Sequence, residues 1–176
     1  MIKFAYFAGG CFWCTESIFQ RINGVKSVVP GYMGGHIKNP AYREVCNGST
    51  GHTETIKITY DHTLVSYGEL LEIFFLTHDP TTLNRQGNDV GTQYRSAVFF
   101  NNLEEKIQIE ECIARLEKEA VYPDKFVTEI NEECPFYEAE KDHHDYYNQN
   151  KSQPYCQFVI TPKIQKLKAI FNQYYV

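Results

Sequence analysis

The sequence has no apolar run long enough to span a membrane, no cluster of basic residues, and no internal repeat or low-complexity tract. A membrane-spanning helix needs about 20 apolar residues, and an extended nucleic-acid surface needs a basic stripe. The chain instead has 17 Lys and Arg against 22 Asp and Glu, a formal charge of −5. We therefore expect no membrane span and no nucleic-acid partner. Without an interdomain linker, the 176 residues are expected to form one domain over residues 1–176.

Tryptophan and methionine are also scarce, with one and two residues, whereas the chain has six Cys, 13 Tyr and 12 Phe. The stretch from Met1 to Cys11 faintly resembles a signal peptide, but its apolar part is short and no separate polar region precedes it. We interpret this stretch as a strand and expect a cytoplasmic protein, in which thiols stay mostly reduced. Cysteines in that compartment are core residues, metal ligands or redox catalysts.

Apolar periodicity predicts strands that alternate with helices. Strands are expected at 2–8, 25–32, 53–60, 94–100, 126–130 and 155–160. Helices are expected at 12–22, 66–75, 101–120 and 138–147, with a last one that begins at Thr161 and Pro162. The segments 33–51 and 79–91 are predicted as long polar loops, the first with one helical turn.

The predicted order is strand, helix, strand, strand, helix, strand, followed by a further helix and strand. The first six elements follow the split β-α-β pattern of ferredoxin-like folds. We therefore predict an α+β fold, namely a ferredoxin-like two-layer α/β sandwich with a mixed sheet, long loops and a C-terminal helical tail.

The stretch from Gly9 to Glu16, GGCFWCTE, puts a thiol beside two glycines and two bulky aromatic residues. Cys11 follows the first predicted strand and precedes a helix. A free thiol with a pKa of about 8.5 is only a few per cent ionised at pH 7, and the amides and dipole of a helix start favour its thiolate. Phe12 and Trp13 would then form an apolar wall beside a reactive sulfur. The alternative is an inert Cys11, with both rings fastening the helix to the sheet.

Glu54 lies in phase with Ile56 and Ile58 in a strand of alternating character. Alternation therefore places its carboxyl on the buried face. Burial disfavours the ionised form and raises the pKa of a carboxyl group, so a buried Glu54 is a candidate general acid. The alternative is that fraying at the strand end turns Glu54 towards solvent.

Three separate segments carry a resemblance to a known family: GGCFWCTE, AYREVCNGSTGHTE and DPTTLNRQGNDVGTQYRSAVFF, in this order. Together they resemble peptide methionine sulfoxide reductases of the A type, from Lys3 to about Lys163. The resemblance implies an oxidoreductase that reduces methionine S-sulfoxide, free or in proteins, and so repairs oxidative damage. It also implies a cysteine sulfenic acid and then an intramolecular disulfide that thioredoxin recycles, with no bound cofactor or metal. We expect a monomer.

The resemblance assigns the reaction chemistry to four residues. Cys11 would attack the sulfoxide sulfur. Glu54 would protonate or hydrogen-bond the sulfoxide oxygen, assisted by the hydroxyls of Tyr42 and Tyr94.

The resemblance also assigns substrate binding. Phe12 and Trp13 would wall a pocket for the substrate methyl group, and Asp89 would help to bind the substrate main chain. The sulfoxide sulfur is tetrahedral, and a methyl pocket on one side with hydrogen-bond donors on the other would bind only one of its two epimers.

The sequence leaves open which thiol reduces the sulfenic acid. Cys156 lies near the C-terminal end, where the family commonly has this thiol, although the glycine-rich tail of many relatives is missing here. Cys14 has the C-x-x-C spacing of redox motifs, and Cys46 lies between Tyr42 and Glu54 in the sequence. We favour Cys156, with Cys14 and then Cys46 as alternatives. Cys112 and Cys134 are interpreted as packing residues.

Two other classes of protein share part of this pattern. A thioredoxin-like disulfide oxidoreductase would explain Cys11 and Cys14 but leaves Glu54 without a role. A non-enzymatic zinc module would use both thiols with His143 and His144, yet structural zinc sites usually have a second closely spaced ligand pair. The adjacent histidines lie in a charged run, and we expect them on a solvated face.

Overall fold

Six strands form one mixed sheet in the order β7-β6-β1-β3-β2-β8 in the computed structural model, which describes residues 1–176. All neighbours are antiparallel except the parallel pair β6 and β7. The strands are β1 (Ile2–Ala8), β2 (Val25–Met33), β3 (Thr53–Asp61), β6 (Ala97–Phe100), β7 (Glu129–Glu132) and β8 (Phe136–Glu138). A separate hairpin consists of β4 (Arg85–Gln86) and β5 (Asp89–Val90).

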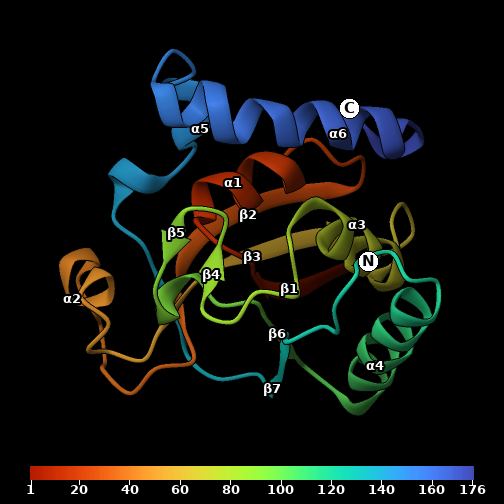
Figure 1. Ribbon diagram of the computed structural model, residues 1–176, viewed down its shortest axis with the longest axis horizontal. Coiled ribbons are helices and arrows are strands. Elements are labelled where there is room, and N and C mark those ends of the chain that lie inside the picture. The colour runs from red at the N-terminus through yellow and green to blue at the C-terminus, as the bar shows by residue number, and fades with distance from the viewer.

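The central strands β6-β1-β3-β2 have the fourth-first-third-second order of a ferredoxin-like sheet. Helix α1 (Phe12–Phe19) connects β1 to β2, and helix α3 (Tyr67–Thr77) connects β3 to β6. Helices α5 (Tyr146–Gln149) and α6 (Thr161–Ile170) lie beyond α1, while α4 (Leu103–Lys118) lies beside α3 (Figure 1). The predicted α+β sandwich with a mixed sheet and a helical tail is therefore confirmed.

Local sequence signals explain where the main elements begin and how they pack. At the start of α3, the hydroxyl of Ser66 accepts a hydrogen bond from the Glu69 N–H at 3.1 Å, and the Glu69 carboxylate accepts one from the Ser66 N–H at 2.9 Å. The ring of Phe7 on β1 packs against Phe74 of α3 and Phe19 of α1, with centroids 4.9 and 5.6 Å apart. The core thus lies between the sheet and these two helices.

The prediction of a strand at 155–160 is wrong. The chain is helical there and forms a π-helical turn, η3 (Cys156–Ile160), that continues into α6. A short apolar run does not distinguish a buried strand from a helix. Pro154 begins the helical segment, and Pro162 has no N–H to donate to the preceding turn, where the helix widens.

The predicted helix at 138–147 is also largely wrong. Phe136–Glu138 joins the sheet as β8, and only a 3-10 turn at Lys141–His143 and the short α5 are helical. Asp145 interrupts the helix with a left-handed backbone (φ 55°), a conformation that Asp tolerates.

Other boundaries differ by a few residues. A 3-10 turn at Thr92–Tyr94 delays β6 to Ala97, and the strand expected at 126–130 is β7. The expected helical turn in the first long loop is α2 (Tyr42–Cys46).

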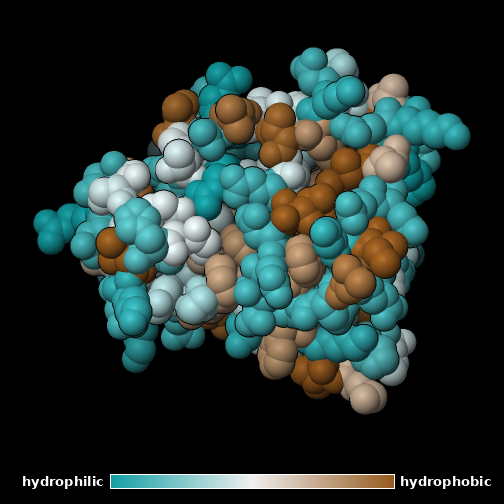
Figure 2. All heavy atoms as spheres, turned by 90° about the horizontal axis from the view of Figure 1, so that it is seen from below, coloured by the Kyte–Doolittle hydropathy of each residue, from teal (hydrophilic) through white to brown (hydrophobic).

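None of the helices combines the length and the apolar character needed to cross a bilayer. Figure 2 shows a face that is mainly hydrophilic, on which hydrophobic residues are exposed in separate groups.

Candidate active site

Cys11 lies between the end of β1 and the start of α1, with an extended backbone and 8% of its surface exposed. The chain reaches it through Gly10, whose φ is +86°, and a side chain at Gly10 would meet that of Gln86 at 2.6 Å. The Trp13 backbone N–H is directed at the thiol and lowers its pKa, but burial and the nearby Glu54 outweigh this donor. The pKa of Cys11 is therefore raised well above its ordinary value, so the helix start alone does not produce a resting thiolate.

Glu54 is buried on β3 with 1% of its surface exposed, as the alternation predicted. Its Oε1 accepts a hydrogen bond from the Phe12 N–H at 3.0 Å, and its carboxyl is also within hydrogen-bond reach of the Cys11 thiol. Burial raises the pKa of Glu54 to about 8, against the opposing effect of these donors. A carboxyl group with this pKa is mostly protonated at pH 7 and can donate a proton.

Tyr42 and Tyr94 both lie near enough to Glu54 to feel its charge. Burial raises the pKa of each phenol, and a charge on Glu54 raises both further. Tyr42 begins α2, where its N–H donates to Oε2 of Glu140 at 3.0 Å, and its hydroxyl contacts the thiol of Cys46. Two neutral phenols therefore lie near the buried carboxyl group.

Trp13 belongs to an aromatic cluster built with the C-terminal part of the chain. Its ring stacks on Tyr146 at 3.7 Å between centroids and 8° between planes. Its Nε1–H donates to Nδ1 of His143 at 3.2 Å, and the His143 ring also packs 4.3 Å from the ring of Tyr42. The expectation that His143 lies on a solvated face is wrong, because this ring is partly buried among aromatic side chains. Phe12 is fully buried.

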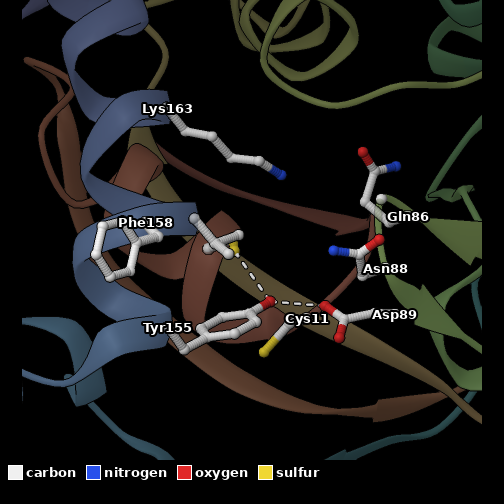
Figure 3. Close-up of a pocket in the computed structure, with 10 residues that line it drawn as sticks. Cys11, Gln86, Asn88, Asp89, Tyr155, Phe158 and Lys163 are labelled. Atoms are coloured by element: carbon white, nitrogen blue, oxygen red, sulfur yellow. Dashed lines mark hydrogen bonds between the residues drawn. The ribbon is translucent and has the colours of Figure 1, made fainter.

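A pocket of about 260 Å³ opens between the β4–β5 hairpin and the C-terminal helical segment (Figure 3). Of the predicted site residues, it exposes Cys11, Asp89 and Cys14, whereas Glu54, the two tyrosines and the two aromatic wall residues lie outside its lining. The complete lining is Cys11, Cys14, Gln86, Gly87, Asn88, Asp89, Tyr155, Phe158, Val159 and Lys163.

Tyr155 extends across this pocket. Its hydroxyl donates to Oδ2 of Asp89 at 2.7 Å and lies 3.7 Å from the sulfur of Cys14, and both contacts are drawn as dashed lines in Figure 3. Its ring meets Trp13 edge-on at 5.9 Å. The Tyr155 hydroxyl is therefore already bound to the carboxylate of Asp89, the group expected to bind the substrate main chain.

All six cysteines are free thiols in this structure. Cys14 is buried but lines the pocket with Cys11, whereas Cys156 is fully buried and does not line it. Cys46 lies half-buried at the end of α2. Cys112 on α4 and Cys134 between β7 and β8 lie outside the pocket lining.

Four further residues that build this site are not indicated by the motifs of the sequence. Tyr155 is signalled only by its position directly before Cys156, and Tyr146 has no local signal. Lys163 extends into the pocket from the C-terminal helix (Figure 3). Glu16, in the same motif as Cys11, is buried and accepts a hydrogen bond from the Asp145 N–H at 2.9 Å, so it ties α1 to the C-terminal segment.

No group of three or more His, Cys, Asp and Glu side chains is arranged to hold a metal ion. The zinc module considered above needs at least three such ligands. His143 instead accepts the hydrogen bond from Trp13.

Comparison with known proteins decides the family. The family model described as "Peptide methionine sulfoxide reductase" matches residues 3–175. The chain belongs to the peptide methionine sulfoxide reductase family. The resemblance inferred from the three motifs is therefore confirmed, and thiol-dependent methionine sulfoxide reduction is the activity of this oxidoreductase.

Individual members of the family are similar over nearly the whole chain. The peptide methionine sulfoxide reductase MsrA of Saccharolobus solfataricus is 52% identical over 170 residues, which cover 97% of this chain and 95% of that protein. The crystal structure of reduced Mxr1 from Saccharomyces cerevisiae matches with a TM-score of 0.80 and 31% identity, over 88% of this chain and 89% of Mxr1. A structure of the same yeast protein in complex with Trx2 shares the fold, with a TM-score of 0.57 and 23% identity over 81% and 84% of the two chains.

Proposed function

We propose that this reductase acts on the S epimer of methionine sulfoxide, free and in oxidised proteins, with Cys11 as nucleophile and Glu54 as proton donor. The observation that supports these roles is the convergence of the two side chains, since the carboxyl group of Glu54 reaches both the thiol of Cys11 and the N–H of Phe12. A neutral acid and a thiol at one point are what a sulfoxide needs, because its oxygen accepts a proton while its sulfur is attacked.

The first half-reaction transfers one oxygen atom. Glu54 donates its proton to the sulfoxide oxygen, with the hydroxyls of Tyr42 and Tyr94 as further donors. The sulfoxide sulfur becomes electrophilic, and the sulfur of Cys11 attacks it as the thiol proton passes to the carboxylate of Glu54, which restores the neutral acid. The substrate S–O bond then breaks as the hydroxyl group is transferred to the Cys11 sulfur. Methionine leaves as a thioether, reduced by two electrons, and Cys11 is oxidised to a sulfenic acid, the reversible first oxidation state of a thiol.

Selectivity for one epimer follows in this proposal from groups on opposite sides of the sulfur. Trp13 and Phe12 receive the methyl group, and the donors at Glu54 receive the oxygen. The substrate main chain binds at Asp89, and it must displace the hydroxyl of Tyr155 from that carboxylate.

The second half-reaction returns the sulfenic acid to a thiol through a disulfide within the chain. Cys156 remains the favoured partner from its position in the sequence, and Cys14 and Cys46 remain alternatives. Thioredoxin is the proposed reductant of the disulfide, which extends to this chain the partner named in the yeast Mxr1 complex with Trx2.

We further propose that the enzyme works as a single-domain monomer in the cytoplasm. Cytoplasmic thiols are kept reduced, and six free cysteines suit that compartment.

A coupled assay tests the proposed function. The protein is supplied with thioredoxin, thioredoxin reductase, NADPH and either the S or the R epimer of a blocked methionine sulfoxide. We expect NADPH consumption with the S epimer alone, and none with the Cys11→Ser variant. Turnover of the R epimer would contradict the proposed selectivity, and activity retained without the Cys11 thiol would contradict its role.

A further inference from the structure

The pocket beside Cys11 contains a lysine that has no partner of opposite charge. Among the residues that line the pocket, the side chains of a charged type are Asp89 and Lys163. The carboxylate of Asp89 accepts the hydroxyl of Tyr155 at 2.7 Å. Lys163 forms no ion pair with a carboxylate of the chain. The protein therefore directs an ammonium group into its own pocket without supplying an anion to pair with it.

The C-terminal helical segment holds Lys163 in this position. Tyr155, Val159 and Lys163 follow one another at intervals of four residues, and residues four apart share a helix face. All three side chains line the pocket. Lys163 is partly buried, and Figure 3 shows it extending from the helix toward the side of the pocket where Gln86 and Asn88 lie. The ammonium group therefore lies over the pocket rather than in open solvent.

Buried groups nearby feel the charge of Lys163. Burial raises the pKa of the Cys14 thiol, and Lys163 is the largest of the effects that lower it. Burial lowers the pKa of His78, and Lys163 lowers it further. A partly buried charge is screened less by water and salt than a surface charge. An anion bound in this pocket would therefore be attracted more strongly than an anion beside an exposed lysine.

A carboxylate suits the groups that surround this cation. The ammonium of a lysine is a compact charge with three N–H donors. The side-chain amide of Asn88 lines the same pocket and has two further donors. The chain as a whole carries a formal charge of −5, which disfavours the approach of acidic substrates from a distance. A preference for such substrates would therefore depend on a short-range contact in the pocket.

We infer that Lys163 binds a carboxylate group of the substrate that lies next to the methionine sulfoxide. This inference rests on the proposed function, since it takes the sulfoxide at Cys11 and the substrate main chain at Asp89. A substrate can supply the carboxylate in two ways: as an acidic side chain beside the oxidised residue of a protein, or as the terminal carboxylate of free methionine sulfoxide. Lys163 thereby determines which oxidised methionines bind best.

Methionine release from three matched pairs of substrates tests the inference. In the first pair, acetyl-methionine sulfoxide is followed by glutamic acid or by glutamine, with an amide at the end. In the second pair, glutamic acid or glutamine precedes the sulfoxide residue. The third pair is acetyl-methionine sulfoxide with a free carboxylate or with an amide. Reduced protein reacts with mixed epimers in the absence of thioredoxin, so recycling of the disulfide does not enter the measurement.

The half-saturating concentration and the limiting rate are measured for each substrate. We expect the carboxylate member of at least one pair to saturate at an about fivefold lower concentration, with a similar limiting rate. The preference should weaken as the salt concentration rises. A preference in the first or second pair identifies a neighbouring acidic side chain as the source, and a preference in the third pair identifies the terminal carboxylate.

Variants of two lysines on the same helix separate this contact from a general effect of charge. Lys163→Gln should remove the preference, so that the two members of each pair saturate alike. Lys163→Arg keeps the positive charge and should keep most of the preference. Lys166→Gln is the matched control, since it removes the same charge from an exposed position on α6 and should keep the preference in full.

Two results would overturn the role of Lys163. One is equal half-saturating concentrations within all three pairs in the unmodified chain, and the other is a preference that persists in Lys163→Gln. Absence of methionine from every substrate with the unmodified chain would instead refute the proposed function. The comparison within pairs in the unmodified chain does not depend on the folding of any variant.

Discussion

The backbone N–H of Phe12 donates a 3.0 Å hydrogen bond to the carboxyl group of Glu54, 42 positions further along the chain. This contact fixes the residue directly after Cys11, the proposed nucleophile, to the proposed acid on the neighbouring strand. Because both ends are buried, the relative position of Cys11 and Glu54 is set by the fold before substrate arrives. The same burial that prepares the acid also makes its ionised form costly.

That cost predicts a pH-dependent gain in stability for Glu54→Gln. The folded pKa of about 8 exceeds the usual 4.5, so Glu54 holds its proton more tightly in the folded state. Stability is therefore lost as pH rises from about 4.5 through 8, and the glutamine variant escapes this loss. We expect equal unfolding free energies near pH 4, and a variant more stable by on the order of 4 kcal/mol at pH 9. Urea unfolding at both pH values measures this, and a constant difference would contradict it.

Glu16→Gln should also become more stable than the unmodified chain as the pH rises, but over a lower pH range. Burial raises the pKa of Glu16 to about 7, and its carboxylate accepts the N–H of Asp145. A glutamine oxygen can accept the same hydrogen bond without a charge. We expect the variant to be more stable by about 3 kcal/mol at pH 8 and unchanged near pH 4.

Glu16→Ala is the contrasting variant, since it removes the acceptor for the Asp145 N–H. It should be less stable than Glu16→Gln at both pH values and should exchange its amide hydrogens faster in α5. Equal stability of the two variants at pH 4 would show that Glu16 does not hold this segment.

Tyr155→Phe should improve substrate binding. The hydroxyl of Tyr155 donates to Oδ2 of Asp89 at 2.7 Å. If Asp89 binds the substrate main chain as proposed, the substrate has to compete for this carboxylate. A hydrogen bond worth about 1 kcal/mol corresponds to a roughly fivefold change in affinity, and we expect KM for a methionine sulfoxide peptide to fall by about that factor. Tyr175→Phe, outside the pocket, is the control. An unchanged KM would show that Asp89 does not bind the main chain or that Tyr155 does not compete.

Some of this site could be predicted from the sequence because the signal was local. Alternation with Ile56 and Ile58 correctly indicated the burial of Glu54, and the strand-to-helix junction correctly located Cys11. The direction of the pKa shift at Cys11 could not be predicted from a local signal. A helix start favours the thiolate, but burial and Glu54 oppose it more strongly.

The C-terminal wall of the pocket could not be predicted, since it depends on contacts between distant parts of the chain. Trp13 forms a hydrogen bond with His143, which lies 130 positions further along the chain, and no local pattern indicates that pair. The apolar run around Phe158 is equally compatible with a strand, and its helical form is what places Tyr155 and Lys163 in the pocket.

The rate of methionine release in a single turnover, measured by rapid quench from pH 6 to 10, tests most directly whether Glu54 protonates the substrate. The unmodified chain should lose rate as pH rises through about 8. Glu54→Gln should be about 100-fold slower at pH 7 and lack this inflection. A Glu54→Gln enzyme with the unmodified rate and pH profile at saturating substrate, and a change in KM alone, would contradict the account.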